Sequence, residues 1–148
     1  MRRLLLVLLL ALPGFGLLGG CEPASELEAQ AVALGIRDVP AFVETVRSVC
    51  SSGRLPERYL TKAEARALGW RPGGDLCRLA PGRMLGGDRF YNRERLLPDR
   101  PGRIWWTADI DARCGERGPR RLVFSNDGLV YVTLDHYRSF IRLPCPGR

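Results

Sequence analysis

The sequence is 148 residues long and carries 23 lysine and arginine residues against 16 aspartate and glutamate residues, a formal net charge of +7 at pH 7. This length suits one domain with one core and argues against several domains. The positive charge favours a polyanion or an anionic membrane surface as partner. A single histidine, His136, and five cysteines without CxxC spacing argue against a metal centre, so we expect no metal and no cofactor.

The N-terminal segment 1–20 has the pattern of a secretory signal. A pair of arginines precedes the uncharged apolar run 4–12, which is too short for a membrane span of about 20 residues. Residues 18–21, Leu-Gly-Gly-Cys, also resemble a bacterial lipobox, in which Cys21 carries the lipid. The alternative is an ordinary signal with a cysteine nearby by chance. Lipidation predicts an exported protein attached to a membrane at the cell envelope, rather than one that spans it.

The remaining cysteines predict a disulfide-bonded domain. Lipidation of Cys21 leaves four cysteines in an oxidising compartment: Cys50, Cys77, Cys114 and Cys145. Four cysteines can pair in three ways, and their spacing alone does not choose between these pairings.

The first predicted helix opens the folded domain. Segment 21–37 is polar and rich in alanine, which predicts a tether or irregular segment, or a loose helix, so the domain is expected over 38–148. Asp38 fits the N-cap of a helix whose apolar residues recur at helical spacing, and Gly53 fits its end.

A second helix and a loop-rich stretch follow. The helix begins at Thr61, which forms a capping-box pattern with Glu64, and ends near Gly69. Glycine and proline then become frequent, including Gly86-Gly87, which predicts loops.

The C-terminal half has the texture of strands. Asn126-Asp127-Gly128 is a hairpin-turn signal between two strand-like runs. Helices first and strands afterwards is the order of an α+β fold, with N-terminal helices packed on a C-terminal antiparallel sheet. The expected strands cover residues 104–110, 122–125, 129–134 and 140–143.

The order of residues from Leu55 onward is similar to that of one known family. The matching segments include Tyr59-Leu60-Thr61-Lys62-Ala63-Glu64-Ala65, Gly86-Gly87-Asp88, Asn92-Arg93-Glu94, Ala108-Asp109-Ile110 and Asp135-His136-Tyr137. Over residues 38 to 143 the chain resembles barnase-like microbial guanyl-preferring ribonucleases. The resemblance implies the microbial ribonuclease fold. It also implies metal-free cleavage of single-stranded RNA after guanosine, through a 2′,3′-cyclic phosphate.

The resemblance also implies the site residues. His136 matches the general acid, Arg117 and Arg121 match arginines that bind phosphate, and Lys62, the only lysine of the chain, matches an active-site lysine. The substrate-binding positions match at Phe90, Asn92, Arg93 and Glu94 of the guanine-binding loop, at Tyr137, which stacks on the base or contacts the phosphate, and at Asp88.

The position of the general base departs from the family. Thr107 stands where the family has a glutamate, and a threonine hydroxyl cannot act as a base at neutral pH. Loss of a positioned base typically costs about 10²–10⁴ in rate, so reduced activity is expected. Our hypothesis is that Asp88 or Glu116 covers part of this role. Asp109 resembles the family's buried aspartate that pairs with arginines, so we interpret it as structural.

Two further expectations rest on the resemblance. The loops that contain Cys77 and Cys114 lie close together in the family, which favours that disulfide and leaves Cys50 for Cys145. The protein is then an exported, monomeric endoribonuclease, and the sequence identifies no inhibitor protein.

The alternatives are a catalytically impaired envelope lipoprotein that binds RNA or another polyanion, and a scaffold with an unrelated envelope partner. The retained Lys62, His136 and arginines argue against the scaffold.

Overall fold

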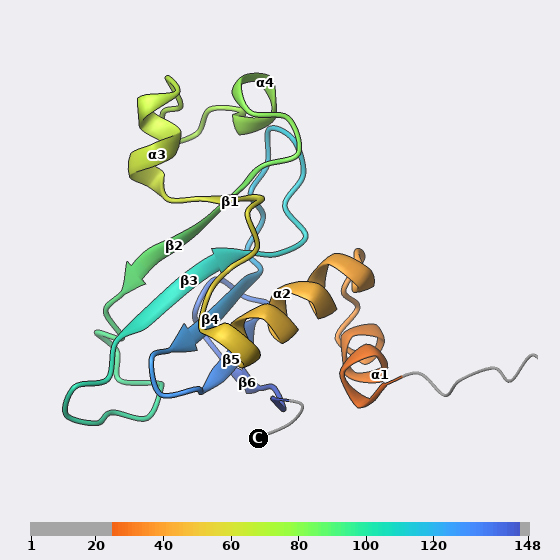
Figure 1. Ribbon diagram of the computed structural model, residues 1–148, viewed down its shortest axis with the longest axis vertical. Helices are drawn as coiled ribbons and strands as arrows, with labels where there is room; N and C mark the ends of the chain where they lie inside the picture. The colour runs from red at the N-terminus through yellow and green to blue at the C-terminus, as the bar shows by residue number, and fades with distance from the viewer. Residues whose placement is uncertain (1–24, 146–148) are drawn as a thin grey trace, which may run out of the picture.

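The computed structural model describes residues 25–145, in which helices pack against a six-stranded sheet (Figure 1). The strand order is β1-β2-β3-β4-β5-β6; β1 and β2 run parallel, and every other neighbouring pair is antiparallel. The elements are α1 (Glu26–Ala33), α2 (Val39–Ser52), β1 (Tyr59–Leu60), α3 (Lys62–Ala67), α4 (Leu76–Leu79), β2 (Met84–Phe90), β3 (Trp105–Asp109), β4 (Arg121–Ser125), β5 (Val130–Thr133) and β6 (Ile141–Arg142). The predicted α+β class is confirmed.

Helix α2 packs on one face of the sheet and forms the main core with it. Asp38 caps its first turn by accepting a hydrogen bond from the Ala41 N–H at 3.0 Å, and Gly53 ends it with a left-handed φ of 70°. The predicted ends of this helix are therefore confirmed. Its apolar side, including Val46 at 0% exposure, packs against β4 and β5 residues such as Leu122.

Within the segment expected as a tether, irregular stretch or loose helix, residues 26–33 form a packed helix, so the irregular alternative is wrong for these residues. Ser25 and Glu28 form a capping box at the start of α1, and Leu27 and Ala31 are buried in the main core. A helix was one of the two alternatives that the sequence left open, and packing against α2 stabilises it.

Strand β2 corrects the predicted loop at Gly86-Gly87. The strand continues through both glycines, with an irregularity between Gly86 and Asp88 where Gly87 takes a φ of 92°. A Cβ atom on Gly86 would lie 2.6 Å from Tyr59 and 2.9 Å from the Ala108 Cβ. Glycine is required here by the close approach of neighbouring strands, a constraint that a local turn signal does not reveal.

The second helix and the hairpin follow the sequence pattern. Thr61 and Glu64 form both hydrogen bonds of the capping box at α3. Asn126-Asp127-Gly128 connects β4 to β5, and a 2.9 Å hydrogen bond from the Ser125 N–H to the Leu129 carbonyl closes the turn.

The predicted signal 1–20 and Cys21 lie outside the described residues. Within residues 25–145, no helix has the length and apolar character needed to cross a membrane.

The disulfide between Cys50 and Cys145 ties the end of α2 to the C-terminal segment, with 5.4 Å between the Cα atoms and 95 residues of sequence separation. Replacing both cysteines by serine is expected to lower the free energy of unfolding by about 4 kcal/mol, because the open chain regains loop entropy. Urea denaturation of the oxidised proteins measures this change. A loss below about 1 kcal/mol would contradict the loop-entropy account.

Candidate active site

The face of the sheet that points away from α2 carries the predicted site. Trp106 and Ala108 of β3 pack in or against the core under α2, so the alternate residues Thr107 and Asp109 point to the opposite face. Asp88 of β2 lies directly across from Thr107 in the register. A carboxylate and a hydroxyl on adjacent strands therefore form the floor of this face.

Two aromatic side chains border Thr107. The hydroxyl groups of Tyr137 and Thr107 lie 3.1 Å apart and share a hydrogen bond. The Tyr137 ring stacks on Phe90 with 5.1 Å between the ring centroids, and the His136 ring lies 5.1 Å from that of Tyr137. The fold thus brings together Thr107, at the position of the general base, and His136, at the position of the general acid. Beside them lie the two aromatic residues that the resemblance assigns to binding of the nucleobase.

The loop that carries His136 is held by Asp135. One carboxylate oxygen accepts hydrogen bonds from the N–H groups of Arg138 and Ser139 at 3.0 and 2.9 Å, and the other accepts from the Ser139 hydroxyl at 2.6 Å. The Ser139 hydroxyl and N–H bonds lower the pKa of Asp135 to about 2, so the carboxylate stays ionised at neutral pH. His136 and Tyr137 have φ values of 58° and 70°, a left-handed conformation that needs such fixation.

Asp109 joins the two arginines of the site. Its carboxylate, at 2% exposure, accepts bonds from Nε and Nη2 of Arg117 at 2.8 and 2.9 Å. Nε of Arg121 lies 3.0 Å from the same carboxylate, and its Nη1 donates to the Gly118 and Arg120 carbonyls at 2.8 and 2.6 Å. Asp109 therefore has the structural position that the resemblance implied.

The two arginines differ in access to solvent. The Arg117 side chain is 37% exposed and that of Arg121 is 3% exposed. The hydrogen bond with Asp109 raises the pKa of Arg117 above its usual value, so this guanidinium stays charged. Arg117 is thus the arginine open to a ligand, whereas Arg121 contacts the protein interior.

Lys62 and Asp88 meet at the start of α3. The Lys62 N–H donates to the Asp88 carboxylate at 3.1 and 3.3 Å, which fixes the carboxylate against the first turn of the helix. Lys62 is partly buried at the first position of α3, beside the floor of the site.

The loop after β2 is closed by Asn92. Its amide group donates to the Leu97 carbonyl at 2.9 Å and accepts from the Leu97 N–H at 3.0 Å. Arg95 takes a left-handed φ of 54° in this loop. Arg93 and Glu94 are exposed in this loop. Asn92 thus organises the loop from within, a role that its place in a guanine-binding motif did not indicate.

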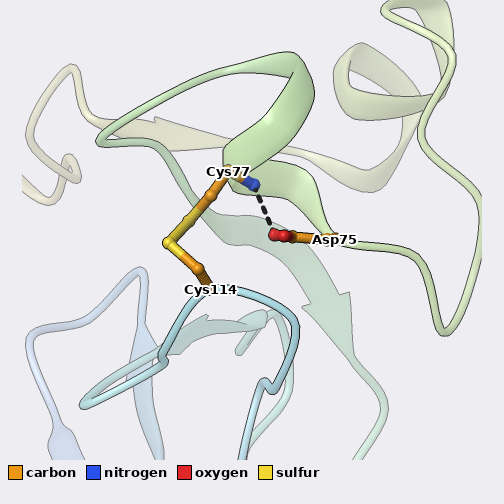
Figure 2. A group of neighbouring side chains, drawn as sticks. All are labelled: Asp75, Cys77 and Cys114. Atoms are coloured by element: carbon orange, nitrogen blue, oxygen red, sulfur yellow. Dashed lines mark hydrogen bonds between the residues drawn. A yellow bond between two sulfur atoms is a disulfide. The ribbon is translucent and has the colours of Figure 1, made fainter.

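A clamp fixes the loop that precedes Arg117. Figure 2 shows Asp75 beside the Cys77–Cys114 disulfide, which joins α4 to this loop. Asp75 Oδ1 accepts from the N–H groups of Cys77 and Gly115, each at 2.9 Å. Because the two sulfur atoms are bonded to each other, we interpret this group as a structural clamp and not as a metal site.

The clamped loop borders a cavity of about 300 Å³, whose lining includes Asp109, Arg113, Glu116 and Arg117. Glu116 is exposed and forms a paired bridge with Arg113 through main-chain hydrogen bonds of 2.9 and 3.0 Å.

Both observed disulfides are the pairs that the resemblance favoured. Asp75 and Asp135 were not expected to support the site. The available signal was their position: Asp75 lies two residues before Cys77, and Asp135 directly precedes His136.

Removal of the clamp is expected to weaken catalysis. We expect the Cys77→Ser, Cys114→Ser protein to lose about tenfold in kcat/KM on RNA, because a misplacement of about 1 Å can cost 10²-fold. Steady-state kinetics on the oxidised proteins measures this. The Cys50→Ser, Cys145→Ser protein is the matched control and should keep its kcat/KM. Equal losses in both proteins would show that general destabilisation, and not the position of Arg117, is responsible.

A model for a protein family described as ribonuclease matches residues 43–144 of this chain. The chain belongs to the ribonuclease family. A ribonuclease of Heyndrickxia coagulans is 50% identical over 91 residues, which cover 61% of this chain and 84% of that protein. Ribonucleases of Bacillus intermedius and Bacillus pumilus are also 50% identical over 91 residues, or 61% of this chain, which spans 56% of their length.

A crystal structure of ribonuclease Sa2 with guanosine-2′-cyclophosphate is 31% identical, with 41% of this chain and 65% of that chain covered and a TM-score of 0.37. Family membership agrees with the α+β fold of the described residues and with the family resemblance identified in the sequence.

Proposed function

We propose that this ribonuclease-family protein is an exported endoribonuclease that cleaves single-stranded RNA after guanosine, without metal. The observation that carries the proposal is the row of groups on the open sheet face, where Asp88 and Thr107 lie beside Tyr137 and the adjoining His136. Arg117 supplies a permanent positive charge at the same face through its pairing with Asp109.

In the proposed reaction the ribose 2′-oxygen attacks the adjacent phosphorus. A bond between phosphorus and the 2′-oxygen forms, and the bond from phosphorus to the 5′-oxygen breaks. The proton of the 2′-hydroxyl passes to a base, and His136 donates a proton to the departing 5′-oxygen. Arg117 stabilises the negative charge that grows on the phosphoryl oxygens. The products are a 2′,3′-cyclic phosphate and a free 5′-hydroxyl.

Asp88 is the favoured substitute for the missing base. It is the direct strand partner of Thr107, so its carboxylate lies next to the position that a glutamate would occupy. The Lys62 N–H donates to both oxygens of this carboxylate, which fixes the orientation of the carboxylate. Glu116 is the second candidate, since it lines the same cavity as Asp109 and Arg117. Asp88→Asn and Glu116→Gln separate the two, and the variant with the larger loss in kcat identifies the base.

Guanine recognition is proposed for the loop from Phe90 to Glu94. The stacked pair of Phe90 and Tyr137 offers an aromatic surface for the base, and the exposed Glu94 is available to accept from the N1 and N2 donors of guanine. Asn92 supports this by holding the loop closed through Leu97.

The test is cleavage by the oxidised protein of guanylyl-uridine and adenylyl-uridine dinucleotides, with mass spectrometry of the products. We expect a cyclic phosphate and a higher kcat/KM for the guanosine substrate. Equal rates for the two substrates would contradict guanine preference, and absence of a cyclic phosphate would contradict the reaction.

A non-catalytic RNA-binding role is the second candidate, favoured by one observation. The Tyr137 hydroxyl bonds to Thr107 at the position where the base is missing. Under this alternative a non-cleavable RNA binds and no substrate is cleaved. Attachment through a lipid at Cys21 is proposed from the sequence alone, and mass spectrometry of the membrane-extracted protein tests it.

A further inference from the structure

An exposed tyrosine lies within the proposed guanine-binding loop. Tyr91 directly follows β2 and is 67% exposed. The guanidinium carbons of Arg89 and Arg93 lie 5.5 and 5.7 Å from the centroid of its ring. These distances are near the outer limit of about 6 Å for a cation–π contact, so the arginines flank the ring without closing it off from solvent.

Tyr91 faces away from the stack of Phe90 and Tyr137. Successive residues of an extended chain point to opposite sides, and Phe90 packs inward on Tyr137 and Phe140. Arg89 and Tyr91, two residues apart, lie together on the other side. A planar group on the Tyr91 ring would therefore lie on the opposite side of the chain from a guanine stacked on the Phe90 ring, although Phe90 also lines the cavity beside Tyr91.

The cavity beside Tyr91 is strongly basic. It measures about 330 Å³, and its charged lining consists of Arg89, Arg93, Arg95 and Arg103 against the single carboxylate of Asp99. Arg103 is committed to Asp127, to which it donates through Nε and Nη2. The other arginines leave an excess of positive charge around an open aromatic ring, a combination that suits a phosphate next to a stacked base.

We propose that Tyr91 and Arg89 form a second nucleotide subsite, which binds a nucleotide of the same RNA strand outside the dinucleotide that is cleaved. Tyr91 stacks on the base of that nucleotide and Arg89 contacts its phosphate. Tyr91 belongs to the proposed guanine-binding loop and Arg89 precedes it on β2, so a strand held at that loop passes this subsite. The proposal rests on the proposed function and extends it to longer substrates.

The test compares a guanylyl-uridine dinucleotide with a hexanucleotide that has its single guanosine flanked by uridines. Tyr91→Ala is expected to lower kcat/KM for the hexanucleotide by about tenfold, because stacking contributes about this much per base. The loss for the dinucleotide, which does not extend to the subsite, is expected to be clearly smaller, and Tyr91→Phe keeps both rates. Truncation at this exposed position leaves no buried cavity, and thermal unfolding verifies that each variant is folded.

Binding supplies a readout that does not depend on cleavage. The probe is the same hexanucleotide with 2′-deoxyguanosine, which lacks the attacking hydroxyl. Arg89→Ala is expected to make the slope of log affinity against log salt shallower by about 0.7, the value for one phosphate contact of a single strand. Arg47→Ala, whose exposed side chain lies on α2, is the matched control and leaves the slope unchanged.

The outcomes separate this proposal from the proposed function. If the wild-type protein cleaves neither substrate, the proposed function fails, while weaker binding of the deoxy probe by Tyr91→Ala still supports the subsite. Cleavage with equal rates for wild type and Tyr91→Ala on the hexanucleotide overturns the subsite alone. Weaker binding of the variants to phosphatidylglycerol vesicles, with unchanged affinity for the deoxy probe, also overturns it and assigns the patch to a membrane surface.

Discussion

Thr107→Glu is expected to raise kcat/KM for guanylyl-uridine by about 10²-fold, the lower part of the range for a positioned general base. The new carboxylate would stand opposite Asp88 on the neighbouring strand, on the face that holds Tyr137. Two carboxylates this close disfavour each other's ionisation, which moves the pKa of one of them upward, toward the working pH of a base. Initial rates over a range of pH measure both the gain and its titration.

Thr107→Gln is the matched control, because it has the size of glutamate and cannot take a proton. We expect it to give no gain, or a loss, since it also removes the hydrogen bond to the Tyr137 hydroxyl. In a Thr107→Glu, Asp88→Asn protein the acidic limb of the pH profile should shift to lower pH. Equal rates for the Glu and Gln proteins would show that position 107 does not face the reacting 2′-hydroxyl.

His136→Asn is expected to lower kcat by about 10²–10⁴, the contribution typical of a general acid. Asparagine is the better test because residue 136 has a φ of 58°, which asparagine tolerates more easily than alanine does. The backbone bond from residue 136 to the Pro119 carbonyl at 3.0 Å should then persist. Steady-state kinetics with a poor and a good leaving group provides the measurement.

A general acid assists a poor leaving group most. The loss in His136→Asn should therefore be large for a dinucleotide and much smaller for a nitrophenyl ester of guanosine 3′-phosphate, whose leaving group needs no proton. Asp135→Asn serves as a positioning control, because it weakens the bonds to Ser139 and leaves the imidazole present. A loss of the same size for both ester substrates would assign His136 to binding instead of proton transfer.

Local sequence signals were enough to predict the ends of several helices and strands. The caps at Asp38 and Thr61 and the turn at Asn126-Asp127-Gly128 act over a few residues, so the sequence alone predicts where these elements begin and end. The family resemblance placed Asp109 among arginines and paired the four cysteines as the structure does.

Other features depended on contacts between distant segments. Gly86 and Gly87 signalled a loop, yet they lie in β2, because Tyr59 and Ala108 approach too closely for any side chain at Gly86. Helix α1 joins the core through its packing on α2, a contact between separate segments.

In the candidate site, too, some features follow from the sequence and others only from the tertiary structure. The family resemblance identified His136 and the departure at Thr107, but it treated Arg117 and Arg121 as equivalent. Only the tertiary structure decided that Arg121 is buried while Arg117 remains accessible. Both arginines pair with Asp109, but the Gly118 and Arg120 carbonyl groups accept hydrogen bonds from Arg121 alone. The residues and the family they resemble thus determined which side chains are candidates for the site, and three-dimensional packing determined which of these side chains are exposed to solvent.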